Sequence, residues 1–125
     1  MCFVAFTFNP FVAFLAGGIG TAVADIISSY PQWAPISFCV HGLEGLCVAL
    51  LVRKGGMIRQ VFGIISAVLI VAGGYFACSG IFMTTFEAAA TEIPGNIGQA
   101  AVGGVLGLLL SKAVIKAYPP VKQLL

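Results

Sequence analysis

The stretch that decides the fold runs from Met57 to Ala77 and reads MIRQVFGIISAVLIVAGGYFA. Its only charged side chain is Arg59, close to the start of the stretch. A helix needs about 20 predominantly apolar residues to cross the hydrocarbon core of a bilayer. Residues 57–77 are therefore predicted to form a membrane-spanning helix.

The rest of the chain shares this apolar character. Of the 125 residues, 60% are hydrophobic and only 8% are charged, whereas soluble domains usually carry about 25% charged residues. The polar side chains are too few to cover a water-facing surface, so lipid must be the solvent for most of the protein. The predicted fold class is all-α, a polytopic transmembrane helix bundle that forms a single domain over residues 1–125. The net charge of +2 is too small to suggest a nucleic-acid partner.

Three further segments are long and apolar enough to cross the membrane. The four predicted spans are residues 10–28, 36–52, 57–77 and 96–115. Pro10 suits the first turn of a helix, where its missing N–H would be unpaired anyway, and Pro119 with Pro120 ends the last span. Residues 1–8 are apolar but too short to span alone, so they are predicted to be a partial helix. Residues 78–95 are predicted to be a loop with room for a short helix at the interface.

The six basic residues determine the predicted orientation. Three of them, Arg53, Lys54 and Arg59, flank the loop between the second and third spans, and the other three, Lys112, Lys116 and Lys122, lie at or beyond the end of the fourth. Two crossings separate these clusters, so both lie on the same side of the membrane. The positive-inside rule then places residues 53–59 and the C-terminus in the cytoplasm, and residues 28–35 and 78–95 outside.

Polar and aromatic side chains near the external side form a candidate binding site. His41 and Glu44 are three residues apart and share a helix face. They form either a buried pair that tightens the bundle or part of a water-accessible pocket. Asn96 and Gln99 lie at the predicted start of the fourth helix, where free backbone N–H groups and the positive end of the helix dipole also point.

Aromatic and acidic residues close to these four leave two interpretations open. Trp33 and Tyr75 either anchor the protein at the membrane interface or stack on a flat ring. Asp25, near the external end of the first span, either reaches the headgroup water or has a functional role. A pocket lined by these groups would suit a polar heterocycle, because amide side chains both donate and accept hydrogen bonds.

The reactive residue types form no catalytic or metal-binding motif in the sequence. The four cysteines, at positions 2, 39, 47 and 78, include no CxxC pair, and His41 is the only histidine. No nucleophile–base arrangement, HExxH motif or phosphate-binding loop is present. The sequence therefore predicts no enzyme, no metal ion and no cofactor.

Five motifs carry a resemblance to a known family. In order, they are Asn-Pro-x-x-Ala followed by Gly-Gly-Ile-Gly-Thr-Ala-Val-Ala-Asp-Ile-Ile (Asn9–Ile27), Tyr-Pro-Gln-Trp-Ala-Pro (Tyr30–Pro35), His-Gly-Leu-Glu-Gly with a following Arg-Lys (His41–Gly45), Gly-Gly-Tyr-Phe (Gly73–Phe76) and Ile-Pro-Gly-Asn-Ile-Gly-Gln (Ile93–Gln99). Their order and spacing resemble the substrate-binding S component of energy-coupling factor transporters, over nearly the whole chain.

The resemblance implies vitamin uptake across a prokaryotic cell membrane. S components of this family usually have six helices, bind a vitamin or precursor from outside, and work with a membrane-embedded coupling protein and two cytoplasmic ATPases. Carried over to this sequence, the ligand site falls on Trp33, His41, Glu44, Tyr75, Asn96 and Gln99. The four spans match the third to sixth helices of the family best, so residues 1–8 are expected to be the end of the second, with the first helix and the loop after it absent.

Two other functions remain open from the residues alone. One is a small structural or interaction protein that assembles through helix faces rich in Gly and Ala, such as residues 100–107. The other is a small multidrug-type proton-coupled exporter that uses Glu44. Within the preferred interpretation the ligand is also open, because a thiamine pyrimidine precursor, a pyridoxine-like ring and other vitamins would all suit a small aromatic pocket.

Overall fold

The computed structural model describes residues 1–53 and 55–124, and it confirms the all-α fold class, since no strand occurs among these residues. The α-helices are α1 (Cys2–Thr7), α2 (Pro10–Ile27), α3 (Ala34–Val52), α4 (Met57–Cys78) and α5 (Phe86–Ala117). Three short helical segments join or follow them: the 3-10 turns η1 (Pro31–Trp33) and η3 (Pro119–Leu124), and the π-helical turn η2 (Ser79–Met83). The helices α2, α3, α4 and α5 are long and apolar enough to cross a membrane.

Local sequence signals explain where these helices begin. The side chain of Asn9 accepts a hydrogen bond from the backbone N–H of Val12 at 3.0 Å, which caps α2 just before Pro10. In the same way Thr85 accepts from the N–H of Ala88 at 3.2 Å and caps α5. The turn between α3 and α4 uses Gly55, whose φ of +71° is a left-handed conformation that glycine adopts without steric penalty.

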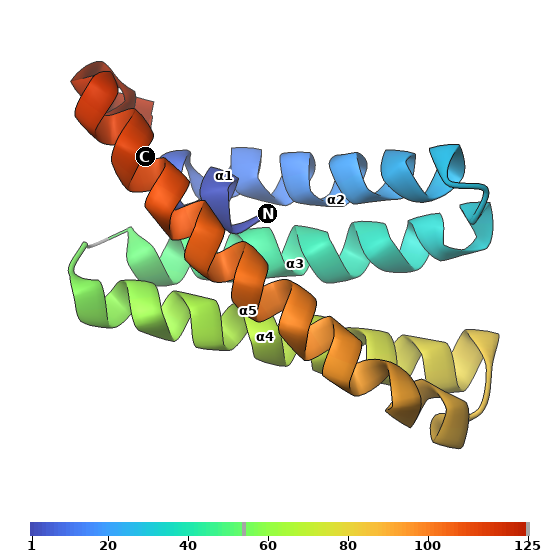
Figure 1. Cartoon of the computed structure of the whole chain (residues 1–125). Helices are drawn as coiled ribbons and strands as arrows, with labels where there is room; N and C mark the ends of the chain where they lie inside the picture. The colour runs from blue at the N-terminus through green and yellow to red at the C-terminus, as the bar shows by residue number, and fades with distance from the viewer. Residues whose placement is uncertain (54, 125) are drawn as a thin grey trace.

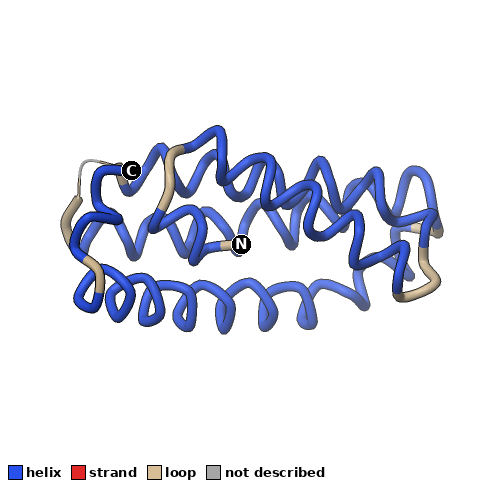
Figure 2. Tube along the Cα trace, turned by 90° about the horizontal axis from the view of Figure 1, so that it is seen from above, coloured by secondary structure: helices blue, strands red, loops and turns tan. Residues whose placement is uncertain are grey.

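The long helices form an open bundle in which α2, α3 and α4 lie side by side and α5 crosses them obliquely (Figures 1 and 2). Helix α2 packs on α3, α3 on α4, and α4 on α5, while the short α1 packs against both α5 and α3. Within the described residues, no Cα atom of α2 lies within 8 Å of a Cα atom of α4 or α5. The bundle is therefore open between α2 and α5 wherever α1 does not fill the gap.

Glycines allow α2 and α3 to approach each other closely. A Cβ atom at Gly17 would lie 2.5 Å from the carbonyl oxygen of His41, and one at Gly45 would overlap the carbonyl oxygen of Ala13. Small residues in membrane helices permit such contacts between backbones, where van der Waals packing replaces the hydrophobic effect. This contact fixes the position of His41 relative to α2.

The prediction of a loop at residues 78–95 was wrong. The chain stays helical through Met83, turns at residues 84–85, and enters α5 at Phe86, ten residues before the predicted start of the fourth helix. Pro94 lies inside α5 and does not end it. Thr85 caps the helix upstream, and membrane helices tolerate an internal proline because neighbouring groups satisfy the carbonyl it leaves free. Asn96 is therefore an interior residue of the helix, and the expected helix N-terminus beside it lies instead at Thr85.

The two ends of the bundle differ in charge. Arg53 ends α3, Arg59 lies in the first turn of α4, and the lysines at positions 112, 116 and 122 lie in the last part of α5 or in η3. The Nζ atom of Lys112 lies 3.9 Å from the sulfur of Met57, the first residue of α4, so both clusters occupy one end (Figure 1). We call this the basic end; the Lys54 that was assigned to it lies outside the described residues.

Candidate functional site

A cavity of about 390 Å³ lies between the helices near the end opposite the basic end. Its volume falls within the range of roughly 300–1,000 Å³ that is typical of small-molecule sites. Its wall draws on α2, η1, α3, α4 and α5. The lining residues are Thr21, Ala24, Asp25, Trp33, Ser37, His41, Tyr75, Glu92, Asn96 and Gln99.

Three rings form an aromatic row along one wall of the cavity. The ring centroid of Tyr75, on α4, lies 6.0 Å from that of Trp33 and 5.6 Å from that of His41. Aromatic pairs at such distances attract each other in tilted or edge-to-face geometry. Because these three residues come from η1, α3 and α4, the row joins three elements and presents polarisable ring surface to the cavity.

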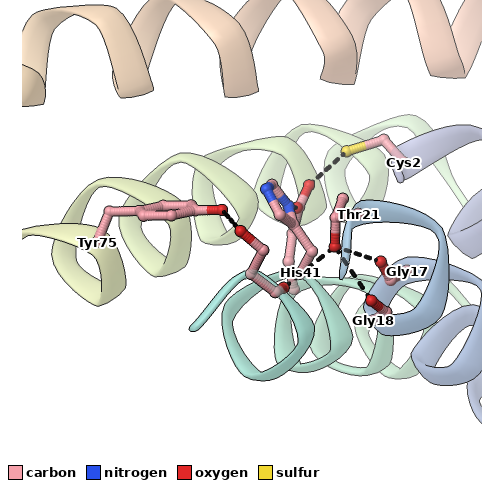
Figure 3. Close-up of polar contacts among 8 residues, drawn as sticks. Cys2, Gly17, Gly18, Thr21, His41 and Tyr75 are labelled. Carbon is pink, nitrogen blue, oxygen red and sulfur yellow. Dashed lines mark hydrogen bonds and ion pairs between the residues drawn. The ribbon is translucent and has the colours of Figure 1, made fainter. Parts of the chain in front are cut away.

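A chain of hydrogen bonds runs beneath this row and ties the helices together (Figure 3). The hydroxyl of Tyr75 lies 2.6 Å from the hydroxyl of Ser37 on α3. The hydroxyl of Thr21, on α2, donates to the backbone carbonyl of Ser37 at 3.2 Å and to that of Gly17 at 2.8 Å. These bonds hold the cavity faces of α2, α3 and α4 in fixed register.

A buried polar cluster forms the inner limit of the cavity. Nδ1 of His41 lies 2.6 Å from Oε2 of Glu44, and the thiol of Cys2 donates to Oε1 of the same carboxyl at 3.4 Å. All three residues are at most 5% exposed. The short hydrogen bond between His41 and Glu44 lowers the free-energy penalty of burying two ionisable groups. Both oxygens of Glu44 are occupied, so the pair positions the imidazole of His41 at the cavity wall.

A smaller cavity of about 120 Å³ lies behind this cluster. Glu44 lines it together with Met1, Cys2 and part of α5, and His41 and Gln99 line both cavities. The two spaces are therefore separated by the side chains of His41 and Gln99. The structure places Glu44 in this inner space and not in the larger cavity.

Helix α5 supplies the wall that faces the aromatic row. Glu92, Asn96 and Gln99 follow one another at helical spacings of four and three, so they share one face. Within the described residues, the side-chain amides of Asn96 and Gln99 make no hydrogen bond to protein. These amides are therefore free to donate to and accept from a bound solute.

The structure brings five of the six residues of the predicted site to one cavity and places the sixth, Glu44, directly behind it. Sequence reasoning missed Ser37 and Thr21. The signal for Ser37 was its position four residues before His41, on the same face of α3. Thr21 had no such signal, because its role depends on the contact between α2 and α3.

The structure shows where the two acidic residues of the site, Asp25 and Glu92, lie. Asp25 lines the cavity, and its Oδ2 atom is shielded from solvent without a hydrogen-bond partner. Glu92 had been assigned to an external loop but lies on the cavity face of α5. Within the described ranges, no group of three or more His, Cys, Asp or Glu side chains is arranged to hold a metal ion.

These features define a class: a small polytopic membrane protein whose helices enclose a solute-sized cavity of aromatic and hydrogen-bonding side chains near one end. A model of the family described as "ECF-type riboflavin transporter, S component" matches residues 1–116. The chain belongs to this family, which confirms the resemblance found in the motifs. It is a membrane transporter component, and the family is not one of enzymes.

A curated relative supports the same extent of similarity. A protein of Pyrococcus woesei described as "Uncharacterized protein in gap 3'region" is 33% identical over 117 residues, which cover 89% of this chain and 77% of the relative. No solved structure gives a significant match.

Proposed function

We propose that this protein is the solute-binding subunit of an energy-coupling factor importer, and that it captures a flat heterocyclic vitamin from the external side of the membrane. Riboflavin is the solute in the name of the matching family. A tricyclic ring with polar edges suits a cavity that combines aromatic surface with amide groups.

The observation that carries the proposal is the pairing of two walls across the cavity. On one side Trp33, Tyr75 and His41 present ring surface. On the other side Asn96 and Gln99 present free amide groups. A planar ring can stack on the first wall while its edge exchanges hydrogen bonds with the second, so one ligand pose uses both.

The charge distribution supports capture from the external side. The positive-inside rule assigns the basic end to the cytoplasm. The cavity lies near the opposite end of the bundle. A solute in the external medium therefore reaches the cavity without crossing the bundle. The proposed partners are a membrane-embedded coupling protein and two cytoplasmic ATPases, which supply the energy for release on the inner side.

Binding to the purified protein tests the proposal. Riboflavin fluorescence is expected to be quenched saturably when the protein, in uncharged detergent, is titrated into the vitamin. The double variant Asn96→Leu with Gln99→Leu is expected to lose this binding, because leucine offers no hydrogen bond. Leu109→Ala is the matched control, since Leu109 is exposed on α5 and does not line the cavity.

Two results would count against this function. One is the absence of saturable quenching by protein whose helical content is intact, together with no heterocyclic vitamin among the molecules that co-purify with it. The other is equal binding by the double variant and the wild type, which would locate the ligand away from this cavity.

A further inference from the structure

The ionisable side chains that line the cavity are mostly acidic. Two carboxyl groups line it, Asp25 from α2 and Glu92 from α5. Every Lys and Arg among the described residues lies at the basic end, and none lines the cavity. Two other groups near the cavity can carry a positive charge: His41, which is paired with Glu44 at 2.6 Å, and the N-terminal amino group of Met1, a residue that lines the inner cavity behind this pair.

Neither carboxyl group is neutralised by the protein around it. Oδ2 of Asp25 has no hydrogen-bond partner although it is shielded from solvent. Glu92 receives one long hydrogen bond, from the hydroxyl of Ser79 at 3.5 Å. The N-terminus of α3 lies beside Trp33, but a helix end contributes only about half a positive charge. Among the residues that line the cavity, the acidic side chains therefore outnumber the basic ones.

We propose that Asp25 and Glu92 determine ligand specificity by charge: the cavity accepts an uncharged or cationic heterocycle and rejects its phosphorylated, anionic form. This inference rests on the proposed function and adds the chemical class of the ligand. A carboxylate only accepts hydrogen bonds, so it pairs with the hydroxyl and ring N–H donors of an unphosphorylated ligand. A phosphate in the same cavity meets two like charges and no Lys or Arg side chain, and like charges in a partly desolvated site repel strongly.

The direct test compares riboflavin with riboflavin 5′-phosphate on the same purified protein. The phosphate ester is expected to bind at least tenfold more weakly at low ionic strength. The double variant Asp25→Asn with Glu92→Gln is expected to narrow this ratio severalfold, because the amides keep the shape and remove the charge. Glu87→Gln is the matched control: Glu87 is an exposed carboxyl in the first turn of α5, outside the cavity lining, and its removal is expected to leave the ratio unchanged.

A second measurement needs no vitamin. Trp33 is the only tryptophan in the chain and lines the cavity, so tryptophan fluorescence reports on this site alone. In uncharged detergent, the quenching of Trp33 by caesium and by iodide is each divided by the quenching of free N-acetyltryptophanamide by the same ion. The normalised value is expected to be larger for caesium than for iodide. Salt and the Asp25→Asn, Glu92→Gln double variant are expected to reduce the difference.

The outcomes separate this inference from the proposed function. Equal affinity for riboflavin and its phosphate would overturn the charge selection while leaving the binding function intact. Failure to bind either flavin would count against the function, and the quenching measurement would still decide the charge of the cavity. A normalised iodide quenching at least as large as the normalised caesium quenching, or a difference that the double variant does not change, would overturn the inference in every case.

Discussion

The two halves of the bundle interior differ in whether a helix fills the space between the long helices. In the basic half, α1 fills the space between α2, α3 and α5 with Cys2, Ala5 and Phe6, all at most 5% exposed. In the other half no helix occupies the corresponding space between α2 and α5, and the cavity remains. The same long helices thus enclose a close-packed core at one end and a solute-sized site at the other.

This difference shows that the site depends on where α1 stops. Met1 and Cys2 line the inner cavity, and the thiol of Cys2 contacts Glu44, whose other oxygen is held by His41. The boundary between filled and open interior is therefore a polar cluster and not an apolar plug. Substitutions on each side of this boundary should separate stability from binding.

The largest effect is expected for Phe6→Ala in the filled half. Removing a buried phenyl ring leaves a cavity and should lower the free energy of unfolding by about 3–5 kcal/mol. The riboflavin affinity of the protein that remains folded should be nearly unchanged, because Phe6 does not line the larger cavity. Thermal unfolding in detergent, followed by helical circular dichroism, measures the loss.

Phe11→Ala is the matched control for this substitution, because Phe11 is 69% exposed on α2. It should change the stability by less than about 1 kcal/mol, since lipid or detergent already surrounds the ring. Equal losses for the two phenylalanines would show that α1 does not form the core of the basic half.

An intermediate effect is expected for Glu44→Leu at the boundary. The change leaves His41 and the Cys2 thiol without their shared partner, and an unpaired buried polar group destabilises by about 1–3 kcal/mol. It should also weaken riboflavin binding, because the imidazole of His41 is no longer held at the cavity wall. Unfolding and flavin titration together would show both losses.

Glu44→Gln keeps the shape and one hydrogen-bonding oxygen, so it should be milder in both measurements. A Glu44→Leu protein as stable as the wild type and equally able to bind would indicate that the polar cluster does not position the site.

The smallest effect is expected for Tyr75→Phe in the open half. This change removes only the hydroxyl that lies 2.6 Å from Ser37 and keeps the ring in the aromatic row. Loss of one hydrogen bond between membrane helices should weaken riboflavin binding by about 1 kcal/mol, or roughly fivefold. Tyr118→Phe, at an exposed position after α5, should leave the affinity unchanged. An unaltered affinity for Tyr75→Phe would show that the register of α3 and α4 does not depend on this bond.

Much of the fold could be predicted from the sequence, because each long helix carries its own apolar run. The ends of α2, α3 and α4 agree with the predicted spans within two residues. The error at residues 78–95 arose because Glu87, Glu92 and Pro94 resemble loop residues in a linear scan. In three dimensions Thr85 caps the helix upstream, and Glu92 faces the polar cavity, so neither acid nor proline has to end the helix.

The candidate site could be predicted only in part. His41 and Glu44 were identifiable as a pair because a spacing of three places two residues on one helix face. Glu92 and Thr21 were not, because their positions at the cavity depend on contacts between residues far apart in the chain. The prediction of a helix N-terminus at Asn96 was also wrong, because it depended on the predicted loop at residues 78–95.

The sequence by itself determined that the protein is a helical membrane protein with its basic residues clustered, because hydrophobic length and charge are properties of each segment alone. Only the tertiary structure decided which half of the interior is filled by α1 and which is left open. It also decided that Asp25 and Glu92 face the same space. The physical reason is that a cavity is defined by the mutual approach of several helices, and in this chain that approach depends on where single glycines such as Gly17 and Gly45 let two backbones meet.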